Sequence, residues 1–218
     1  SSFITSEVRD MREMFYGCKA VRLIDVNTFE TSNVVQFRSM FAECENLQAA
    51  DLRNFNTKSA WEFSHVFENC KSLVDVAMPA AFDMGSMRSG WMNYSAGTQY
   101  PNTWQAETDA GYTTMGMTYI FAGCSNLPYV DMSGISNTAL ISASLTEWDG
   151  MFKDCASLTE VKWPERNSIP FYDLVTMRYM FQGCTSLKYA DLSFLRCEHP
   201  SYDDNPDNIN FMFEGCTS

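Results

Sequence analysis

The sequence predicts an α/β solenoid with a parallel sheet on one face and short helices on the other. Three observations support this: seven cysteines recur along the chain, a phenylalanine precedes each of them by three residues, and the apolar spacing changes from helical to extended at each cysteine. A short helix and a short strand cannot bury their apolar faces alone, so neighbouring copies must stack. We therefore expect residues 1–218 to form a single repeat domain of about seven repeats.

The cysteines define the repeat. Seven of the eight cysteines are separated by 26, 26, 54, 31, 29 and 32 residues, intervals in the range of solenoid repeats. The predicted structural core consists of these cysteines and the phenylalanines before them: Phe15, Cys18, Phe41, Cys44, Phe67, Cys70, Phe121, Cys124, Phe152, Cys155, Phe181, Cys184, Phe213 and Cys216.

Each repeat contains two patterns of apolar residues. In the second repeat Val34, Phe37, Phe41 and Cys44 are spaced by 3, 4 and 3 residues, which predicts one stripe of a helix of about three turns. After the cysteine, stretches such as "LQAADL" and "LPYVDM" alternate, which predicts a short strand whose residues six and eight past the cysteine face inward. One repeat is thus expected to be a helix, a turn and a strand.

The composite phrase "MF-x-x-C-x-x-L-x-x-x-DL", preceded by "F-x-T-S-N-V", resembles the BspA-like leucine-rich repeat family of bacterial surface proteins. It is especially similar to the Met-Phe-x-x-Cys variant, with about 25 residues per repeat. "FETSNVVQFRSMFAEC" and "VTMRYMFQGCTSLKYADLS" carry the match best, and it covers the chain except roughly residues 79–113 and 197–208. The resemblance implies a leucine-rich-repeat-like solenoid that serves as a non-catalytic protein-interaction or adhesion module of a cell-surface or secreted protein.

One corner of the repeat departs from ordinary leucine-rich repeats. Those repeats place Asn or Cys three residues after the last apolar residue of the strand, whereas this sequence has Phe29, Phe55, Ile135 and Leu195 there. An asparagine ladder is therefore absent, and we expect apolar side chains to stack in that corner.

Charge excludes several classes of partner. The chain has 15 basic against 27 acidic residues and a net charge of −12, so we expect no binding to nucleic acid or to an anionic membrane surface. No transmembrane segment and no secretory signal peptide can be read from the sequence given. It begins and ends inside the repeat phrase, so we expect a fragment of a longer chain; an extracellular or cell-surface location rests on the resemblance.

The cysteines are expected to be reduced, buried and structural. Packed helices lie about 8–10 Å apart, beyond the Cα separation of roughly 7 Å that a disulfide spans. Single cysteines 26 or more residues apart do not have the spacing of a zinc site, so no metal and no cofactor is expected. Cys197 lies outside the repeat phase in a polar stretch, "RCEHPSYDDNPDN", which matches no metal-binding spacing.

The interval between Cys70 and Cys124 is about two periods long. Residues near 79–113 are therefore either an insertion or a degenerate repeat. The segment concentrates aromatic residues in a Gly-, Ser- and Asn-rich background, and these form one candidate binding site: Trp91, Tyr94, Tyr100 and Trp104. Aromatic residues on a loop can mark recognition of a protein or glycan; the alternative is that they cover the solenoid.

The outward strand positions form the second candidate binding site. Residues five and seven past each cysteine should line the concave face of the sheet, the surface that solenoids commonly use for binding. This predicted site comprises Asp25, Asp51, Asp75, Tyr129, Asp131, Glu160, Tyr189 and Asp191. The alternative is a solvated face whose aspartates serve turns and solubility.

No catalytic motif accompanies the repeats. The sequence contains no nucleophile elbow, zinc-binding His pair, P-loop or dinucleotide-binding motif, and its two histidines leave few general bases. We therefore expect no enzymatic activity. The partner is expected to be a protein or glycan ligand, and the alternative function is a glycan-binding module or spacer of a larger surface enzyme.

Overall fold

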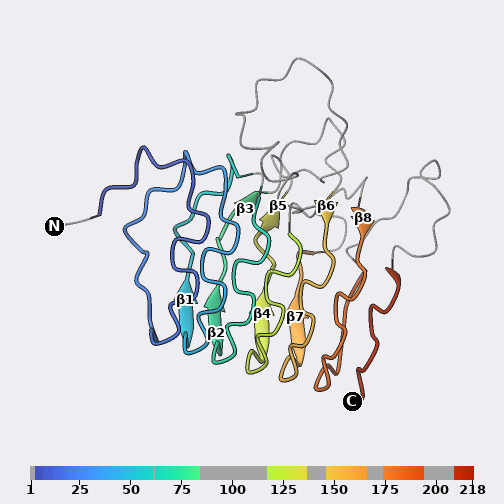
Figure 1. Cartoon of the computed structure of the whole chain (residues 1–218). Coiled ribbons are helices and arrows are strands. Elements are labelled where there is room, and N and C mark those ends of the chain that lie inside the picture. Colours follow the sequence, from blue (N-terminus) through green and yellow to red (C-terminus); the bar gives the residue numbers. More distant parts are fainter. Residues whose placement is uncertain (1–2, 61, 84–116, 137–145, 166–173, 194–208) are drawn as a thin grey trace, which may run out of the picture.

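The computed structural model describes residues 3–60, 62–83, 117–136, 146–165, 174–193 and 209–218. We number the repeats 1 to 7 by their cysteines. The "arm" is the eleven residues that end at the cysteine, and the "strand segment" is the residues three to nine positions after it. The repeats lie side by side from repeat 1 at the N-terminal end to repeat 7 at the C-terminal end (Figure 1).

Eight short strands lie within the described residues. They are β1 (Ala49–Asp51), β2 (Asp75–Ala77), β3 (Phe82–Asp83), β4 (Tyr129–Asp131), β5 (Ile135–Ser136), β6 (Thr146–Glu147), β7 (Glu160–Lys162) and β8 (Leu174–Thr176). They pair in parallel as β1–β2, β3–β5, β4–β7 and β6–β8. Strands β1, β2, β4 and β7 stand side by side, and β3, β5, β6 and β8 lie together in the upper half of Figure 1.

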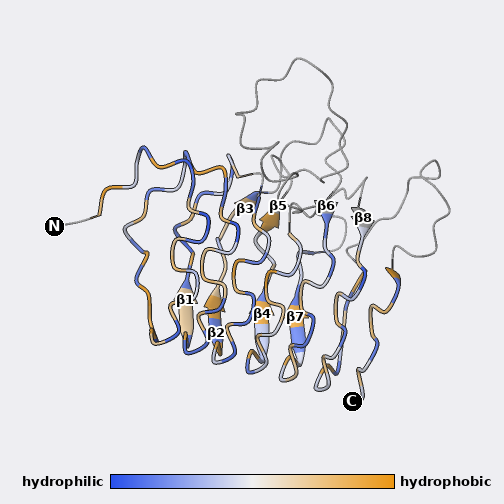
Figure 2. Ribbon diagram, viewed as in Figure 1, coloured by the Kyte–Doolittle hydropathy of each residue, from blue (hydrophilic) through white to orange (hydrophobic). Residues whose placement is uncertain are grey.

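The predicted alternation of the strand segment is confirmed. The middle residues Ala50, Val76, Val130 and Val161 are buried, while their neighbours in the same strands are exposed or half-buried. Figure 2 shows the corresponding change of hydropathy along β2, β4 and β7. The register is exact from repeat to repeat, with Ala50 opposite Val76 and Val130 opposite Val161. Each of these four strands therefore buries one face and presents the other to solvent.

The predicted helices are wrong. The arms in the described residues are successions of turns, because their backbone N–H groups are divided between two directions. In repeat 2 the N–H groups of Phe37 and Phe41 donate across to Glu62 O (3.0 Å) and Val66 O (2.9 Å) of repeat 3, while Cys44 N donates to Phe41 O (3.2 Å) within its own arm. An α-helix would direct these groups four residues back along its own chain.

Left-handed backbone prevents the arms from becoming helical. Two positions in each arm, five residues and one residue before the cysteine, have positive φ. In repeat 2 these are Ser39 (φ 53°) and Glu43 (φ 61°), and four repeats have glycine directly before the cysteine. An L-residue in this conformation costs roughly 1–2 kcal/mol, and the lateral hydrogen bonds to the next repeat offset that cost.

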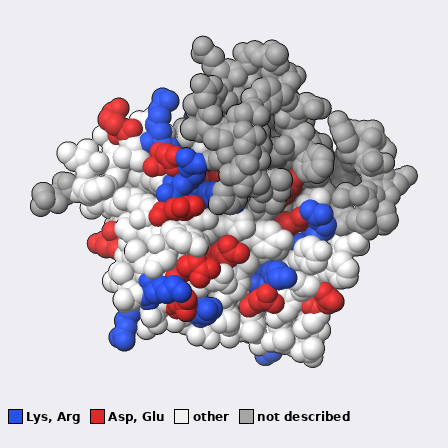
Figure 3. Space-filling view, in the orientation of Figure 1, with Lys and Arg blue, Asp and Glu red and all other residues white. Residues whose placement is uncertain are grey.

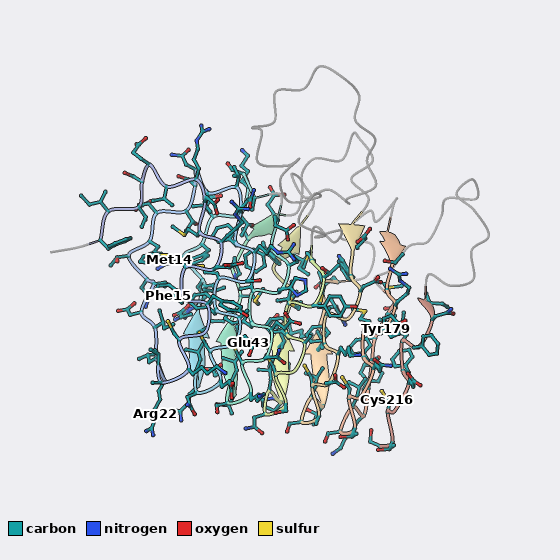
Figure 4. All side chains as sticks on the ribbon, in the orientation of Figure 1. Met14, Phe15, Arg22, Glu43, Tyr179 and Cys216 are labelled. Carbon is teal, nitrogen blue, oxygen red and sulfur yellow. The ribbon has the colours of Figure 1, made fainter. Side chains whose placement is uncertain are left out.

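The phenylalanines of the arms form a continuous column inside the solenoid. The ring of Phe67 lies 5.2 Å from Phe41 and 5.6 Å from Phe121, in both cases nearly parallel at 7°. The residues that the helical pattern selected as core, such as Val34 and Phe37, are fully buried. The prediction of which side faces the core is therefore confirmed for repeats 2 to 6, although the secondary structure is wrong. In repeats 1 and 7 the predicted core is incomplete: Phe15, Cys18 and Cys216 are half-buried and Phe213 is 44% exposed, since each of these arms has a neighbouring arm on one side only within the described residues. Side chains fill the interior from Phe15 at one end to Cys216 at the other (Figure 4).

Repeats 3 and 4 contact each other directly despite the long interval between their cysteines. Phe67 N donates to Ile120 O at 2.8 Å, and the Cys124 thiol reaches Phe67 O at 3.0 Å. The arms of these two repeats are thus neighbours in the stack, with β2 in contact with β4. Residues 84–116, which connect them, lie outside the described residues.

The corner after the strand segment combines an apolar stack with a threonine ladder. Phe29, Phe55 and Ile135 are buried there, and Leu195 lies outside the described residues. Two residues further on, Thr31 Oγ1 donates to Asn56 O (3.2 Å) and accepts from Asn56 N (2.7 Å). Thr5 and Thr57 make the same reciprocal pair with the following repeat. Threonine hydroxyls thus satisfy the turn backbone that asparagine serves in ordinary leucine-rich repeats.

The cysteines described here are all unpaired thiols. Each thiol from repeat 2 onward donates to the carbonyl of the arm phenylalanine in the preceding repeat, as Cys70 does to Phe41 O at 3.1 Å. The expected helix spacing was the wrong reason for excluding disulfides, since laterally bonded segments lie about 4.8 Å apart. Burial raises the pKa of Cys44 to about 11 and of Cys184 to about 12, so these thiols are poor nucleophiles.

Candidate binding surface

The strand face is the surface formed by residues five and seven past each cysteine. All eight residues of the predicted concave-face site lie on it and within the described residues: Asp25, Asp51, Asp75, Tyr129, Asp131, Glu160, Tyr189 and Asp191. The parallel pairs β1–β2 and β4–β7 hold five of them in register, namely Asp51, Asp75, Tyr129, Asp131 and Glu160. Asp25, Tyr189 and Asp191 occupy the equivalent positions of repeats 1 and 6, outside the strands. This face is regular, and its composition changes from one end of the solenoid to the other.

Several apolar side chains on this face are exposed. Tyr189 is 62% exposed and Tyr129 41%, and in repeat 1 Leu23 is 69% exposed. Val74, next to the strand face in repeat 3, is also exposed. Single exposed apolar residues are common on any protein, but here they recur at the same position of several repeats.

The aspartates of the strand face cap turns. Asp25, Asp51, Asp131 and Asp191 each accept a hydrogen bond from the backbone N–H two residues later, at 2.8–3.1 Å. Asp51 also forms an ion pair with Arg53 (2.6 Å), and Asp131 one with Lys162 (2.8 Å). These carboxylates therefore have structural partners, and their recurrence follows from the turn. On the face seen in Figure 3, acidic and basic residues are interspersed.

Glu160 differs from these aspartates. It is exposed in the column five residues past the cysteine, and no hydrogen bond or ion pair engages its carboxylate within the part of the chain described. It lies opposite Tyr129 in the β4–β7 pairing. Burial, followed by the charge of Asp131, raises the pKa of Tyr129, and Glu160 contributes in the same direction.

The arms contain buried acidic residues that the sequence analysis missed. Glu62, Glu147 and Asp149 are buried at outward positions of the arms. Asp149 is bound by Arg178 of the next repeat through the guanidinium (Nη2–Oδ2, 2.6 Å) and the backbone N–H (2.7 Å). Burial, reinforced by Asp149, raises the pKa of Glu147 to about 7, and burial also raises that of Glu62. The signal available in the sequence was the presence of acidic residues at corresponding positions of the arms.

A row of aromatic rings lies on the outer side of the arms. The rings of His65 and Tyr119 stack at 5.3 Å and those of Tyr179 and Phe211 at 5.4 Å, and Lys153 Nζ lies 5.5 Å from the Tyr179 ring. Figure 4 shows Tyr179 toward the C-terminal end of the stack. One face of each ring is used in this stacking, while Phe211 at the end of the row remains 52% exposed.

Other candidate residues fall outside the described part of the chain. The insertion-loop aromatics Trp91, Tyr94, Tyr100 and Trp104, and Cys197, belong to this group. Among the described residues no group of three or more His, Cys, Asp or Glu side chains is arranged to hold a metal ion. In the same residues no helix has the length and apolar character needed to cross a membrane.

Comparison with known families accounts for nearly the whole chain. Residues 1–106 match the family described as "Mycoplasma protein of unknown function, DUF285", and residues 102–196 match "BspA type Leucine rich repeat region (6 copies)". No curated protein matches the chain significantly.

Two solved structures are similar to the chain. One is the leucine-rich repeat protein of T. pallidum, at 17% identity over 83% of this chain and 72% of that one, with a TM-score of 0.40. The other is a leucine-rich repeat protein of Bacteroides ovatus, at 17% identity over 81% of this chain and 44% of that one, with a TM-score of 0.30. Superpositions this loose support no argument about the present chain.

The stacked parallel strands and the repeat motif define a leucine-rich repeat protein. Together with the match of residues 102–196 to the BspA-type repeat model, they confirm the resemblance to BspA-like leucine-rich repeats that was read from the sequence.

Proposed function

We propose that the chain is a non-catalytic protein-interaction module that binds its partner on the strand face. The observation that carries the proposal is the series of exposed apolar side chains at equivalent positions of the strand face, Leu23, Tyr129 and Tyr189. Large exposed aromatic residues are favoured anchors in protein interfaces because they bury much surface at low entropic cost. The BspA-type repeat family supports an interaction role. Leucine-rich repeat families are generally non-catalytic.

Adhesion at a bacterial surface is the biological setting we propose for this module. It rests on the family resemblance: proteins with BspA-type repeats are often associated with the bacterial surface. In that setting the solenoid would present the strand face to a matrix protein or to another cell.

The proposal can be tested with purified matrix proteins and glycans in a binding array. A strand-face variant combines Leu23→Ser, Tyr129→Ser and Tyr189→Ser. A matched control variant combines Tyr16→Ser, Ile209→Ser and Phe211→Ser, which removes three exposed apolar side chains from the arms. We expect a protein ligand whose affinity falls at least tenfold in the strand-face variant and is unchanged in the control, with circular dichroism showing that both are folded.

Four results would contradict the proposal. Loss of binding only in the arm variant would move the site to the arms. Binding to glycans alone would favour the glycan-binding alternative, and binding to nothing on the array would count against an interaction module. Hydrolysis of any offered glycan or peptide would overturn the non-catalytic assignment.

A further inference from the structure

The column five residues past the cysteine has a distinctive order in repeats 3 to 6. Acidic and aromatic residues alternate there: Asp75, Tyr129, Glu160 and Tyr189. Repeats 1 and 2 have Leu23 and Ala49 at the same position. Only Glu160 within this described column has an aromatic residue on both sides.

The register of the three repeats around Glu160 is set by backbone hydrogen bonds. Thr159 N donates to Pro128 O at 2.9 Å, and Lys188 N donates to Thr159 O at 3.3 Å. These bonds join the residues just before Tyr129, Glu160 and Tyr189, so the three side chains follow one another across the sheet. Neighbouring strands are about 4.8 Å apart, which puts the two tyrosines roughly 10 Å from each other.

We propose that Tyr129, Glu160 and Tyr189 form a clasp for an arginine side chain of a protein partner. A cation is attracted by an aromatic ring when it lies within about 6 Å of the ring centroid. Two rings roughly 10 Å apart can both satisfy this condition for one guanidinium held between them. The carboxylate of Glu160 then lies beneath the guanidinium and can accept two parallel hydrogen bonds from it. The clasp deepens the proposed function and rests on the strand face being the binding face.

The surrounding charges fit this assignment. Lys162, two residues beyond Glu160, is held by Asp131 at 2.8 Å, which neutralises it locally. Lys188 precedes Tyr189 and is exposed. The carboxylate of Asp75, in contrast, acts on Arg53 of this chain, whose pKa it helps to raise after the larger effect of Asp51. Glu160 is thus better placed than Asp75 to receive a cation from outside.

Two short peptides test the clasp: acetyl-Val-Arg-Val-amide and its citrulline analogue, which has the same shape without the charge. Fluorotyrosine is incorporated into the full chain and observed by ¹⁹F NMR. The resonances of Tyr129 and Tyr189 are assigned by their disappearance in Tyr129→Phe and Tyr189→Phe. We expect the arginine peptide to shift both resonances saturably with a millimolar Kd. The citrulline peptide should bind at least tenfold more weakly.

The acidic residues provide the matched pair of variants. Glu160→Gln should weaken binding of the arginine peptide at least fivefold, whereas Asp75→Asn should change it less than twofold. An equal response to both peptides, an equal effect of the two variants or no saturable shift would each overturn the clasp. If the peptides fail while the strand-face variant still loses its protein ligand on the array, the proposed function stands and only the clasp falls.

Discussion

The arm and the strand segment of each repeat cover the same core but use their backbones differently. In the strand segment the hydrogen bonds run to neighbouring repeats and alternate side chains point inward, as in β1 and β2. In the arm every second N–H turns back into its own repeat, and left-handed residues recur at two positions four residues apart. The spacing of buried residues thus shows which side of a segment faces the core, but it does not determine the hydrogen-bonding pattern of the backbone.

The arm imitates a helix because its turns also repeat every four residues. The inward residues Phe37 and Phe41 are four apart, as on one face of a helix, and so are the left-handed Ser39 and Glu43. A helical stripe and a chain of such turns therefore give the same apolar pattern. The following predictions separate the two segments, from the largest expected effect to the smallest.

Phe121→Ala should cause the largest loss of stability. The ring lies in the middle of the phenylalanine column, 5.6 Å from Phe67 and 5.4 Å from Phe152, and is fully buried. Removing a buried phenylalanine costs about 3–5 kcal/mol. On the strand segment of the same repeat, Val130→Ala removes two methyl groups and should cost about 2 kcal/mol. Urea unfolding measures the free energy of unfolding of both variants. Equal losses would mean that the phenylalanine column contributes no more to stability than the strand segment does.

Glu147→Gln should stabilise the protein, and more so at high pH. The pKa of Glu147 is raised to about 7 in the folded chain from an ordinary value of 4.5, so the folded state favours the protonated form. This favourable contribution is complete below about pH 4.5 and is lost as the pH rises through about 7. Above pH 7 the ionised, buried carboxylate costs up to about 3 kcal/mol, which glutamine avoids.

Thermal or urea unfolding at pH 5 and pH 8 tests this prediction. The gain from Glu147→Gln should be at least twice as large at pH 8 as at pH 5. Glu160→Gln, which removes a carboxylate from the exposed strand face, is the matched control for the loss of one negative charge. A Glu147→Gln gain that is the same at both pH values would mean that this carboxyl titrates normally.

Gly123→Ala distinguishes turns from a helix by the sign of its effect. In an exposed helix, replacing glycine by alanine stabilises by roughly 1 kcal/mol. In this arm Gly123 has φ 75°, and an added Cβ would collide with the Asn69 side chain, so we expect a loss of about 1–2 kcal/mol. Gly17 is left-handed too (φ 68°) but has open space around it, so Gly17→Ala should cost less. A gain in either variant would favour a helical arm.

The sequence was sufficient to predict the repeats, strands β1, β2, β4 and β7, and the inward positions of those strands. It did not predict β3, β5, β6 or β8, and the strands expected in repeats 1 and 6 are reduced to an isolated bridge at Leu23 and to irregular backbone. The cysteine period identified the stack, and alternation in "LQAADL" placed Ala50 and Leu52 correctly. A signal for the arm was also present: the residue before each of the seven repeat cysteines is Gly, Asn, Asp or Glu, and the first three are the residues that most readily adopt positive φ. The hydrophobic spacing of the arm predicts a helix, whereas these residues before the cysteines indicate left-handed turns.

The chemistry of the site was harder to predict from the sequence. Periodicity could place Asp51 and Asp131 on the strand face, but their partners Arg53 and Lys162 depend on side-chain geometry across and along the strands. Side-chain geometry also explains why those aspartates have bonding partners whereas Glu160 does not among the described residues. Burial of Glu147 could not be predicted either, because its outward position in the arm suggests exposure.

Asp51→Ala should have the smallest effect and tests the structural role of the strand-face aspartates. The carboxylate accepts from Arg53 N at 3.1 Å and pairs with the Arg53 guanidinium, but the pair is exposed, so the loss should be below about 1 kcal/mol. Asp51→Asn keeps a side-chain oxygen that can accept from Arg53 N and should recover most of that loss, because the turn cap needs an acceptor rather than a charge. Urea unfolding at low and high salt separates the two contributions. If Asp51→Asn is as destabilising as Asp51→Ala at low salt, and both effects vanish at high salt, the ion pair and not the turn accounts for this aspartate.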